Sequence, residues 1–145
     1  MAEGRQPRVL LVCMPFQSVQ FPSLGLGLLK PSLTRHGIPC DIRYASLDHA
    51  REIGFDLYQL VAVTYPTVLS MVGDWIFSAA LFDDDPDPGL RLLERVRRAD
   101  PEVVGLFGED REDFCEGAAR ARRGAGGFLD RLLDDLDAAR YDVIG

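Results

Sequence analysis

The segment that most constrains the fold of this chain is an unbroken apolar run of six residues, Val9 to Met14, which Pro15 ends. Such a run is typical of a strand covered on both faces, and Pro15 cannot donate to a sheet ladder. A segment rich in glycine and leucine, Pro22 to Leu29, follows a short loop. We therefore predict a strand over residues 8–14, a loop over 16–21, and then a helix. Nucleotide- or cofactor-binding α/β domains usually begin in this way.

The helix predicted after this loop runs from Leu24 to His36, with Ser23 as its N-cap and Gly37 as its left-handed C-cap. Pro31 inside it would remove one hydrogen bond at a cost of about 3 kcal/mol, so we expect a kink there rather than a new helix. Leucines are expected to form its apolar stripe, and glycines to allow close approach to the sheet. These residues are Leu24, Leu28 and Leu29, and Gly25 and Gly27.

The next segment alternates between apolar and polar residues from Ile38 to Tyr44, which predicts a second strand that includes Cys40 and Ile42. Residues 1–47 then form one strand-helix-strand unit, parallel and right-handed. Residues 48–140 have a mainly helical pattern, and residues 141–145 have the pattern of a third buried strand at its start. The predicted fold class is α/β: an incomplete Rossmann-like parallel sheet flanked by helices, with a largely helical insertion after strand two. We expect a single, truncated N-terminal α/β domain over 1–145.

The helical part is predicted in several pieces separated by breaks at Tyr65-Pro66, Asp100-Pro101 and a flexible turn, Gly124 to Gly127. The pieces cover residues 47–53, 57–63, 90–98, 111–122 and 126–139. Side chains expected to point inward are Leu90, Leu93 and Val96 in the third piece, and Phe128, Leu132, Leu133 and Leu136 in the last. The run Met71 to Phe82 is either buried or lines a groove, and Val103 to Phe107 is either a short strand or a helical turn.

Composition excludes several classes of function. A net charge of −7 and scattered arginines disfavour binding to nucleic acid, because the phosphate backbone would be repelled. No window holds eighteen apolar residues, and the polar N-terminus has no signal-peptide core, so we expect no membrane span and a cytoplasmic location. Three widely spaced cysteines do not predict a disulfide framework or a metal knuckle.

The turn after the first predicted strand is the first candidate site, because a helix N-terminus offers unpaired N–H groups to a phosphate or cofactor. The contributing residues would be Pro15, Phe16, Ser23, Leu24 and Gly25. The glycines lie inside the helix, and the spacing is neither GxGxxG nor GxxxxGK[ST]. On pattern alone, helix-on-sheet packing is therefore the favoured role for these glycines.

Other candidates are weaker. Trp75, the single indole, can stack on a planar ligand, but packing in the core is the favoured interpretation. Asp83, Asp85, Asp87 and Glu94 have calcium-loop spacing, yet Pro88 occupies a position that needs positive φ. The two histidines, His36 and His49, have no obvious nucleophile or acid partner in the sequence. We therefore predict no catalytic constellation and no metal site.

Seven segments have to be considered together: residues 9–16, 22–29, 37–42, 53–58, 65–67, 73–82 and 141–145. They resemble the opening of cobalamin-binding domains in cobalamin-dependent radical SAM enzymes, in particular the subgroup that matures ribosomally made peptides. The resemblance implies cobalamin as cofactor, the turn residues above with Trp75 as its contacts, and methylation of a peptide as the reaction of the full-length relatives. It also implies that residues 141–145 form an inner strand.

The chain departs from that family in one important way. It has no CxxxCxxC motif, so the iron-sulfur cluster and SAM would belong to a downstream domain that is missing here. We therefore expect a fragment that is not catalytic alone and retains little or no cobalamin. Its expected partners are a ribosomal precursor peptide or a separately encoded radical SAM portion, and it is expected to self-associate through an exposed sheet edge.

Two alternatives remain open at this point. A non-catalytic binding module would use the apolar run Met71 to Phe82 as a docking surface for a peptide or a partner subunit. The N-terminal half of a glycosyltransferase with two Rossmann-like domains also begins with a strand, a proline-containing loop and a glycine-containing helix. That second alternative explains residues 9–36 but not the segment around Trp75.

Overall fold

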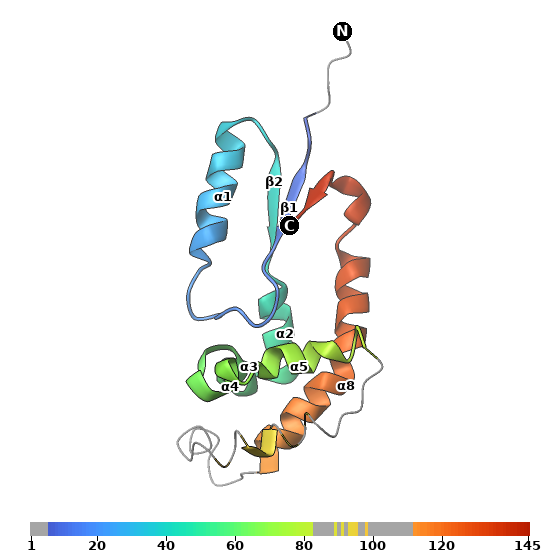
Figure 1. Cartoon of the computed structure of the whole chain (residues 1–145). Coiled ribbons are helices and arrows are strands. Elements are labelled where there is room, and N and C mark those ends of the chain that lie inside the picture. Colours follow the sequence, from blue (N-terminus) through green and yellow to red (C-terminus); the bar gives the residue numbers. More distant parts are fainter. Residues whose placement is uncertain (1–5, 83–88, 90, 92, 96–97, 99–111) are drawn as a thin grey trace.

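A computed structural model describes residues 6–82, 89, 91, 93–95, 98 and 112–145 (Figure 1). Two long helices flank a small sheet, and a group of shorter helices lies beyond one end of it (Figure 1). The elements are, in chain order, β1 Val9–Val12, α1 Leu24–Arg35, β2 Cys40–Arg43, α2 Ala45–Ile53, α3 Phe55–Val63, α4 Tyr65–Leu69, α5 Val72–Ser78, α8 Glu112–Asp135, a 3-10 turn Ala138–Arg140, and β3 Val143–Ile144.

The described sheet has the order β2-β1-β3, and both pairings are parallel. Val9 lies opposite Cys40 on one side and Val143 on the other, so β1 is the central strand. The predicted parallel strand-helix-strand unit is thus confirmed. A third strand is confirmed as well, but not its predicted burial, because both residues of β3 are exposed and the strand lies at an edge of the described sheet.

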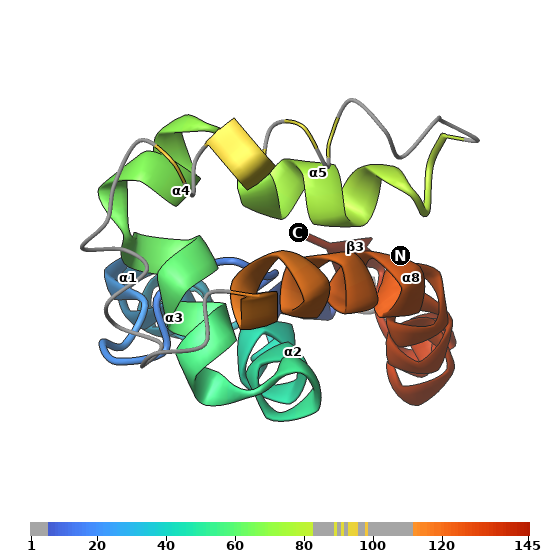
Figure 2. The ribbon, with the colours of Figure 1, turned by 90° about the horizontal axis from the view of Figure 1, so that it is seen from below.

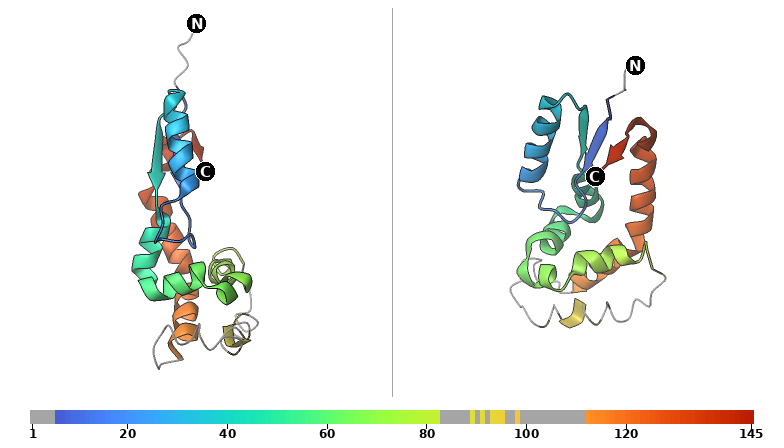
Figure 3. Two further views of the ribbon diagram at one scale, coloured as in Figure 1. Left: turned by 90° about the vertical axis from the view of Figure 1, so that its left-hand side faces the viewer. Right: turned by 45° about the horizontal axis from the view of Figure 1, so that its top comes forward.

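Helices cover both faces of this sheet (Figure 3). Val9 and Leu11 of β1 form a cluster with Leu26 and Leu33 of α1, whereas Val12 lies in a second cluster with the C-terminal half of α8. Because neighbouring side chains of a strand point to opposite faces, α1 and this half of α8 lie on opposite sides of the sheet. An α/β architecture with a parallel sheet between helices is therefore established.

Helix α1 agrees with the prediction in its ends and its cap but not in its packing face. The hydroxyl of Ser23 accepts a bond from the N–H of Leu26 at 3.3 Å, and Gly37 has the predicted positive φ of 76°. The helix runs as one element from Leu24 to Arg35, through Pro31, so no new helix begins there. The Ser23 N-cap and the end of the helix before Gly37 could be predicted from the sequence because both depend on local chemistry.

The predicted apolar stripe of α1 is wrong. Leu24 and Leu28 are 77% and 65% exposed, and Leu29 is exposed as well. Leu26 and Leu33, seven residues and thus two turns apart, pack against the sheet instead. The glycines do not mediate a close approach: a Cβ built on Gly27 would meet no atom within 4 Å, and one on Gly25 only the Ser23 hydroxyl.

The shorter helices begin close to where the pattern placed them. Helices α2 and α3 start two residues before the predicted pieces 47–53 and 57–63 and end where predicted. The predicted break at Tyr65-Pro66 is wrong by position, because the chain breaks at Thr64, which is extended, and both Tyr65 and Pro66 belong to α4. The apolar run Met71 to Phe82 is divided: Val72 and Ile76 are buried, while both ends of the run are exposed.

The last long helix corrects a further prediction. Helix α8 is one helix of 24 residues, so Gly124 to Gly127 is helical and not a flexible turn. Its small residues form a contact face: Ala118, Ala121 and Ala125 are buried, in the same cluster as Ile76 of α5, and α5 and α8 run side by side (Figure 2). Close packing on this face stabilises the helix against a cost of roughly 1 kcal/mol for each interior glycine.

The inward face of α8 was only partly predicted. Phe128 and Leu132 are buried and Leu136 is half-buried, but Leu133 is 65% exposed. Leu133 is five residues from Phe128, and five residues turn a helix by about 500°, which moves the side chain well off the shared face. Leu129 packs in this cluster instead.

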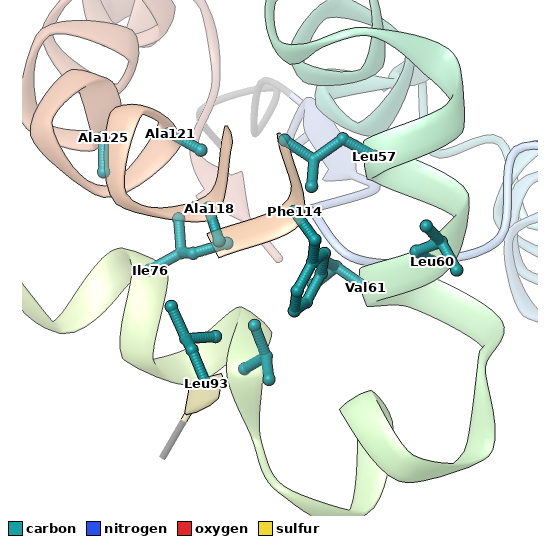
Figure 4. Packing of buried hydrophobic residues seen from close by; sticks show 10 residues of the cluster. Leu57, Leu60, Val61, Ile76, Leu93, Phe114, Ala118, Ala121 and Ala125 are labelled. Carbon is teal, nitrogen blue, oxygen red and sulfur yellow. The ribbon is translucent and has the colours of Figure 1, made fainter. Parts of the chain in front are cut away.

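The main core lies among the helices beyond the sheet, where side chains from α3, α5 and α8 converge (Figure 4). Leu93 is fully buried in this core, as predicted. The other predicted inward residues of that piece, Leu90 and Val96, lie outside the described residues, as do the segment 103–107 and the acidic run 83–88. Within the described part of the chain, no group of three potential metal ligands occurs.

Candidate functional site

The loop that follows β1 lies between two cavities at the carboxyl end of the strand. The first, here called the apolar cavity, has a volume of about 420 Å³ and is formed by this loop with α3, α4, α5 and α8. Its lining residues are Met14, Pro15, Phe16, Val61, Ala62, Thr67, Val68, Met71, Gly73, Asp74, Phe77, Leu81 and Leu129. In parallel sheets with helices on both faces, ligands bind at this edge.

The second, here called the loop cavity, has a volume of about 370 Å³ and lies between the same loop and the starts of α1 and α2. Several of its lining residues carry a hydroxyl or amide group, although most of the lining surface is apolar. The lining residues are Cys13, Gln17, Ser18, Val19, Gln20, Phe21, Pro22, Ser23, Tyr44, Ser46 and Leu47. The two cavities thus differ in the residue types that line them, and the loop 14–23 separates them.

Two hydrogen bonds at Gln17 fix the position of the loop that follows β1. The hydroxyl of Tyr58, on α3, donates to the backbone carbonyl of Gln17 at 2.7 Å, and burial raises the pKa of this tyrosine. The Cys13 thiol donates to the side-chain carbonyl of Gln17 at 2.8 Å and lies 3.4 Å from the Ser46 hydroxyl. Both contacts fix the middle of the loop between the two cavities.

Phe16 forms part of the wall of the apolar cavity and packs directly on α5. A Cβ on Gly73 would lie 2.6 Å from a ring carbon of Phe16, so only glycine permits this approach. The hydroxyl of Thr67, fully buried, donates to the backbone carbonyls of Leu60 and of Thr64, the latter at 2.8 Å. Its hydroxyl proton is therefore used within the protein, and the lining stays largely apolar.

Behind this wall lies His49, which is 1% exposed. Its ring packs against Phe16 and Phe77 at centroid distances of 5.4 and 5.1 Å, and both phenylalanines also line the apolar cavity. Neither ring nitrogen has a hydrogen-bond partner among the described residues. Burial lowers the pKa of His49 to about 4, with a smaller opposing effect of Glu52, so the imidazole is neutral at pH 7.

The structure divides the residues that the sequence proposed as one site. Pro15 and Phe16 line the apolar cavity, and Ser23 lines the loop cavity while it caps α1. Leu24 and Gly25 are exposed and line neither of these two cavities.

Trp75 has a structural position on α5, away from the linings of both cavities. The guanidinium of Arg122 lies over its ring at 4.9 Å from the centroid, and donates to its backbone carbonyl and, at 2.7 Å, to the Ser78 hydroxyl. The indole packs against the main core. The stacking of Trp75 on a cation of the protein itself supports its role in packing.

The expectation that the run Met71 to Phe82 is buried or lines a groove agrees with the structure, since Asp74 and Phe77 line the apolar cavity. Sequence reasoning missed the residues that α3, α4 and α8 contribute, such as Ala62 and Leu129, because only tertiary packing brings these helices together. Sequence reasoning also assigned no role to His49. One pattern could have shown that it is buried: Ala45, Ser46, His49 and Ala50 fall at positions that share one face of α2.

No family model, curated protein or solved structure matches this chain. Among the described helices, none combines the length and the apolar character that a membrane crossing requires.

Proposed function

We propose that this chain is the cofactor-binding N-terminal part of a cobalamin-dependent radical SAM protein that methylates a ribosomally made peptide, and that it is not catalytic alone. The observation that carries the proposal is the pair of cavities flanking the loop after β1, at the carboxyl edge of a parallel sheet. The strand order β2-β1-β3 with helices on both faces agrees with the first three strands of one doubly wound order, and sheets of that kind bind ligands at this edge. The family resemblance described in the sequence analysis is what supports cobalamin as the ligand.

The residues at this edge fit a corrinoid in part. Ser18, Gln17 and Gln20 line the loop cavity and offer hydroxyl and amide groups to the amide arms of the corrin ring. Neither histidine of the chain is presented to the metal: His49 is enclosed behind Phe16, and His36 lies at the far end of α1. Cobalamin, when bound, supplies a carrier for a methyl group; the chain itself supplies binding and orientation.

Titration of the purified chain with hydroxocobalamin, followed by absorbance and equilibrium dialysis, tests this proposal. We expect no stoichiometric corrinoid in the protein as purified or after reconstitution and removal of the excess, and only weak, saturable binding during the titration. Ser18→Trp fills the loop cavity and weakens binding at least about tenfold, a loss of roughly 1.4 kcal/mol. Ser32→Trp, on the exposed side of α1, is the matched control and leaves binding unchanged. A chain that shows no saturable binding contradicts the proposal.

A second candidate function is supported by the exposed ends of the run Met71 to Phe82. Met71 and Leu81 are exposed and line the apolar cavity, and Phe82 beside them is exposed as well. Exposed apolar side chains around a recess are typical of a binding surface. The proposed function is then docking of a peptide or a partner subunit, with or without cobalamin. Saturable binding of a precursor peptide to the purified chain, weakened by Leu81→Ser, is the expected result.

A further inference from the structure

One carboxylate stands among the otherwise uncharged residues that line the apolar cavity. Asp74 lies in the first turn of α5, and its side chain is exposed. No ion pair joins Asp74 to another of the described residues. Three residues further along the same helix, Phe77 also lines the cavity. Residues three apart share one face of a helix, so a carboxylate and an aromatic ring face the same space.

The rim of the cavity extends its apolar surface outward. Val68, Met71 and Leu81 line the cavity and yet remain exposed, the last by 76%. Met14, at the end of β1, completes this rim and is also exposed. A ligand that only filled 420 Å³ would leave this rim in water, so the surface suits an occupant that is longer than the cavity.

We infer that the apolar cavity binds a peptide segment that carries a large apolar side chain next to a lysine or arginine. This inference deepens the second function proposed above and rests on it. The apolar side chain fills the cavity, and flanking residues cover Val68, Met71 and Leu81. The cation pairs with Asp74 and lies near the ring of Phe77, which adds a cation–π attraction. The net charge of −7 also attracts a basic segment over longer distances.

The test is fluorescence anisotropy with a labelled peptide that contains a Leu-Phe pair between two lysines. Two further peptides serve as probes, one with glutamates in place of the lysines and one with serines in place of Leu-Phe. We expect the lysine peptide to bind, the glutamate peptide to bind at least about fivefold more weakly, and the serine peptide not to bind. Raising the salt from 50 to 500 mM weakens binding of the lysine peptide, because the ion pair at the rim is screened.

Two variants and one control connect this binding to the cavity. Asp74→Asn weakens binding of the lysine peptide about three- to fivefold and removes the preference over the glutamate peptide. Asp56→Asn is the matched control, since it makes the same change in the first turn of α3 and lines neither cavity. Ala62→Phe fills the cavity and abolishes binding of both charged peptides. Thermal unfolding by circular dichroism confirms that each variant is folded.

The outcomes separate this inference from the function on which it rests. If the two charged peptides bind equally well and Ala62→Phe abolishes both, peptide docking stands and the inferred preference for a basic segment is wrong. If no peptide binds, both are wrong. If small amines compete as strongly as the lysine peptide, or anionic vesicles bind instead, the occupant is not a peptide and the inference is overturned.

Discussion

The imidazole of His49 packs against the ring of Phe128 at a centroid distance of 4.6 Å, and this contact joins α2 to α8 beneath the wall of the apolar cavity. The rings of Phe16, Tyr58 and Phe77 surround the same histidine. A neutral imidazole suits such surroundings, whereas a charged one would be without a hydrogen-bond partner and out of water. The residue therefore links the stability of the helical core to pH.

We expect the free energy of unfolding to fall as the pH is lowered from about 6.5 to about 4. The pKa of His49 is about 4 in the folded protein and 6.5 in the unfolded chain, so the unfolded state binds more protons between these values. Stability therefore rises with pH in this window and is fully present above it. The loss is on the order of 3 kcal/mol at the acid end. Urea unfolding at several pH values measures it.

His49→Leu should remove this contribution to the pH dependence. The variant also eliminates two buried ring nitrogens without partners, so its stability at pH 7 should not fall by more than about 1 kcal/mol. His36→Gln is the control, because it replaces the other histidine at an exposed position, and the loss of stability between pH 6.5 and 4 that His49 causes should remain in this variant. If the free energy of unfolding of His49→Leu depends on pH as it does in the unchanged protein, another group is responsible for the pH dependence.

Gly126→Ala should stabilise the protein by about 0.5–1 kcal/mol. Gly126 lies inside α8, and an added Cβ would meet no atom within 4 Å, so alanine gains helix propensity without a clash. Gly117→Ala is the comparison, since a Cβ there would lie 3.2 Å from Leu57 and part of the gain is lost. Chemical denaturation measures both. A destabilising effect of Gly126→Ala would instead support a flexible turn at this position.

The leucines of α1 should separate into two classes on substitution. Leu24→Gln and Leu28→Gln should change the free energy of unfolding by less than about 0.5 kcal/mol, because both side chains are largely in water. Leu26→Ala and Leu33→Ala should each cost about 1–3 kcal/mol, since both pack against the sheet. Equal costs for the two pairs would contradict the packing face of α1 in the structure.

Arg122→Met should destabilise the protein by about 1–3 kcal/mol. The guanidinium is buried, lies over the Trp75 ring and donates to two oxygens of α5, so its loss leaves acceptors with fewer partners. Because Trp75 is the single indole, its fluorescence reports both the unfolding and the change in its surroundings. Arg123→Met, at an exposed neighbouring position, is the control and should have little effect.

Prediction from sequence succeeded where local chemistry decides the structure. The apolar run of β1, the alternation of β2, the Ser23 cap and the positive φ of Gly37 all depend on near neighbours in the chain. It failed where leucines or glycines are abundant. Leucines of α1 occupy several faces of the helix, so periodicity could not select Leu26 and Leu33. Glycines of α8 look like a turn until packing against α3 and α5 is known.

The sequence by itself determined the order and type of the elements from β1 to α3 and the parallel arrangement of the first two strands, because propensity, capping and the rules of chain connection act locally. Only the tertiary structure decided which side chains share a space. Gln17 meets Tyr58 across 41 residues of sequence, and Phe16 and Asp74 reach one cavity from a loop and a distant helix. The reason is physical: close packing among α3, α5 and α8 sets these distances, and no local pattern records which helix faces meet.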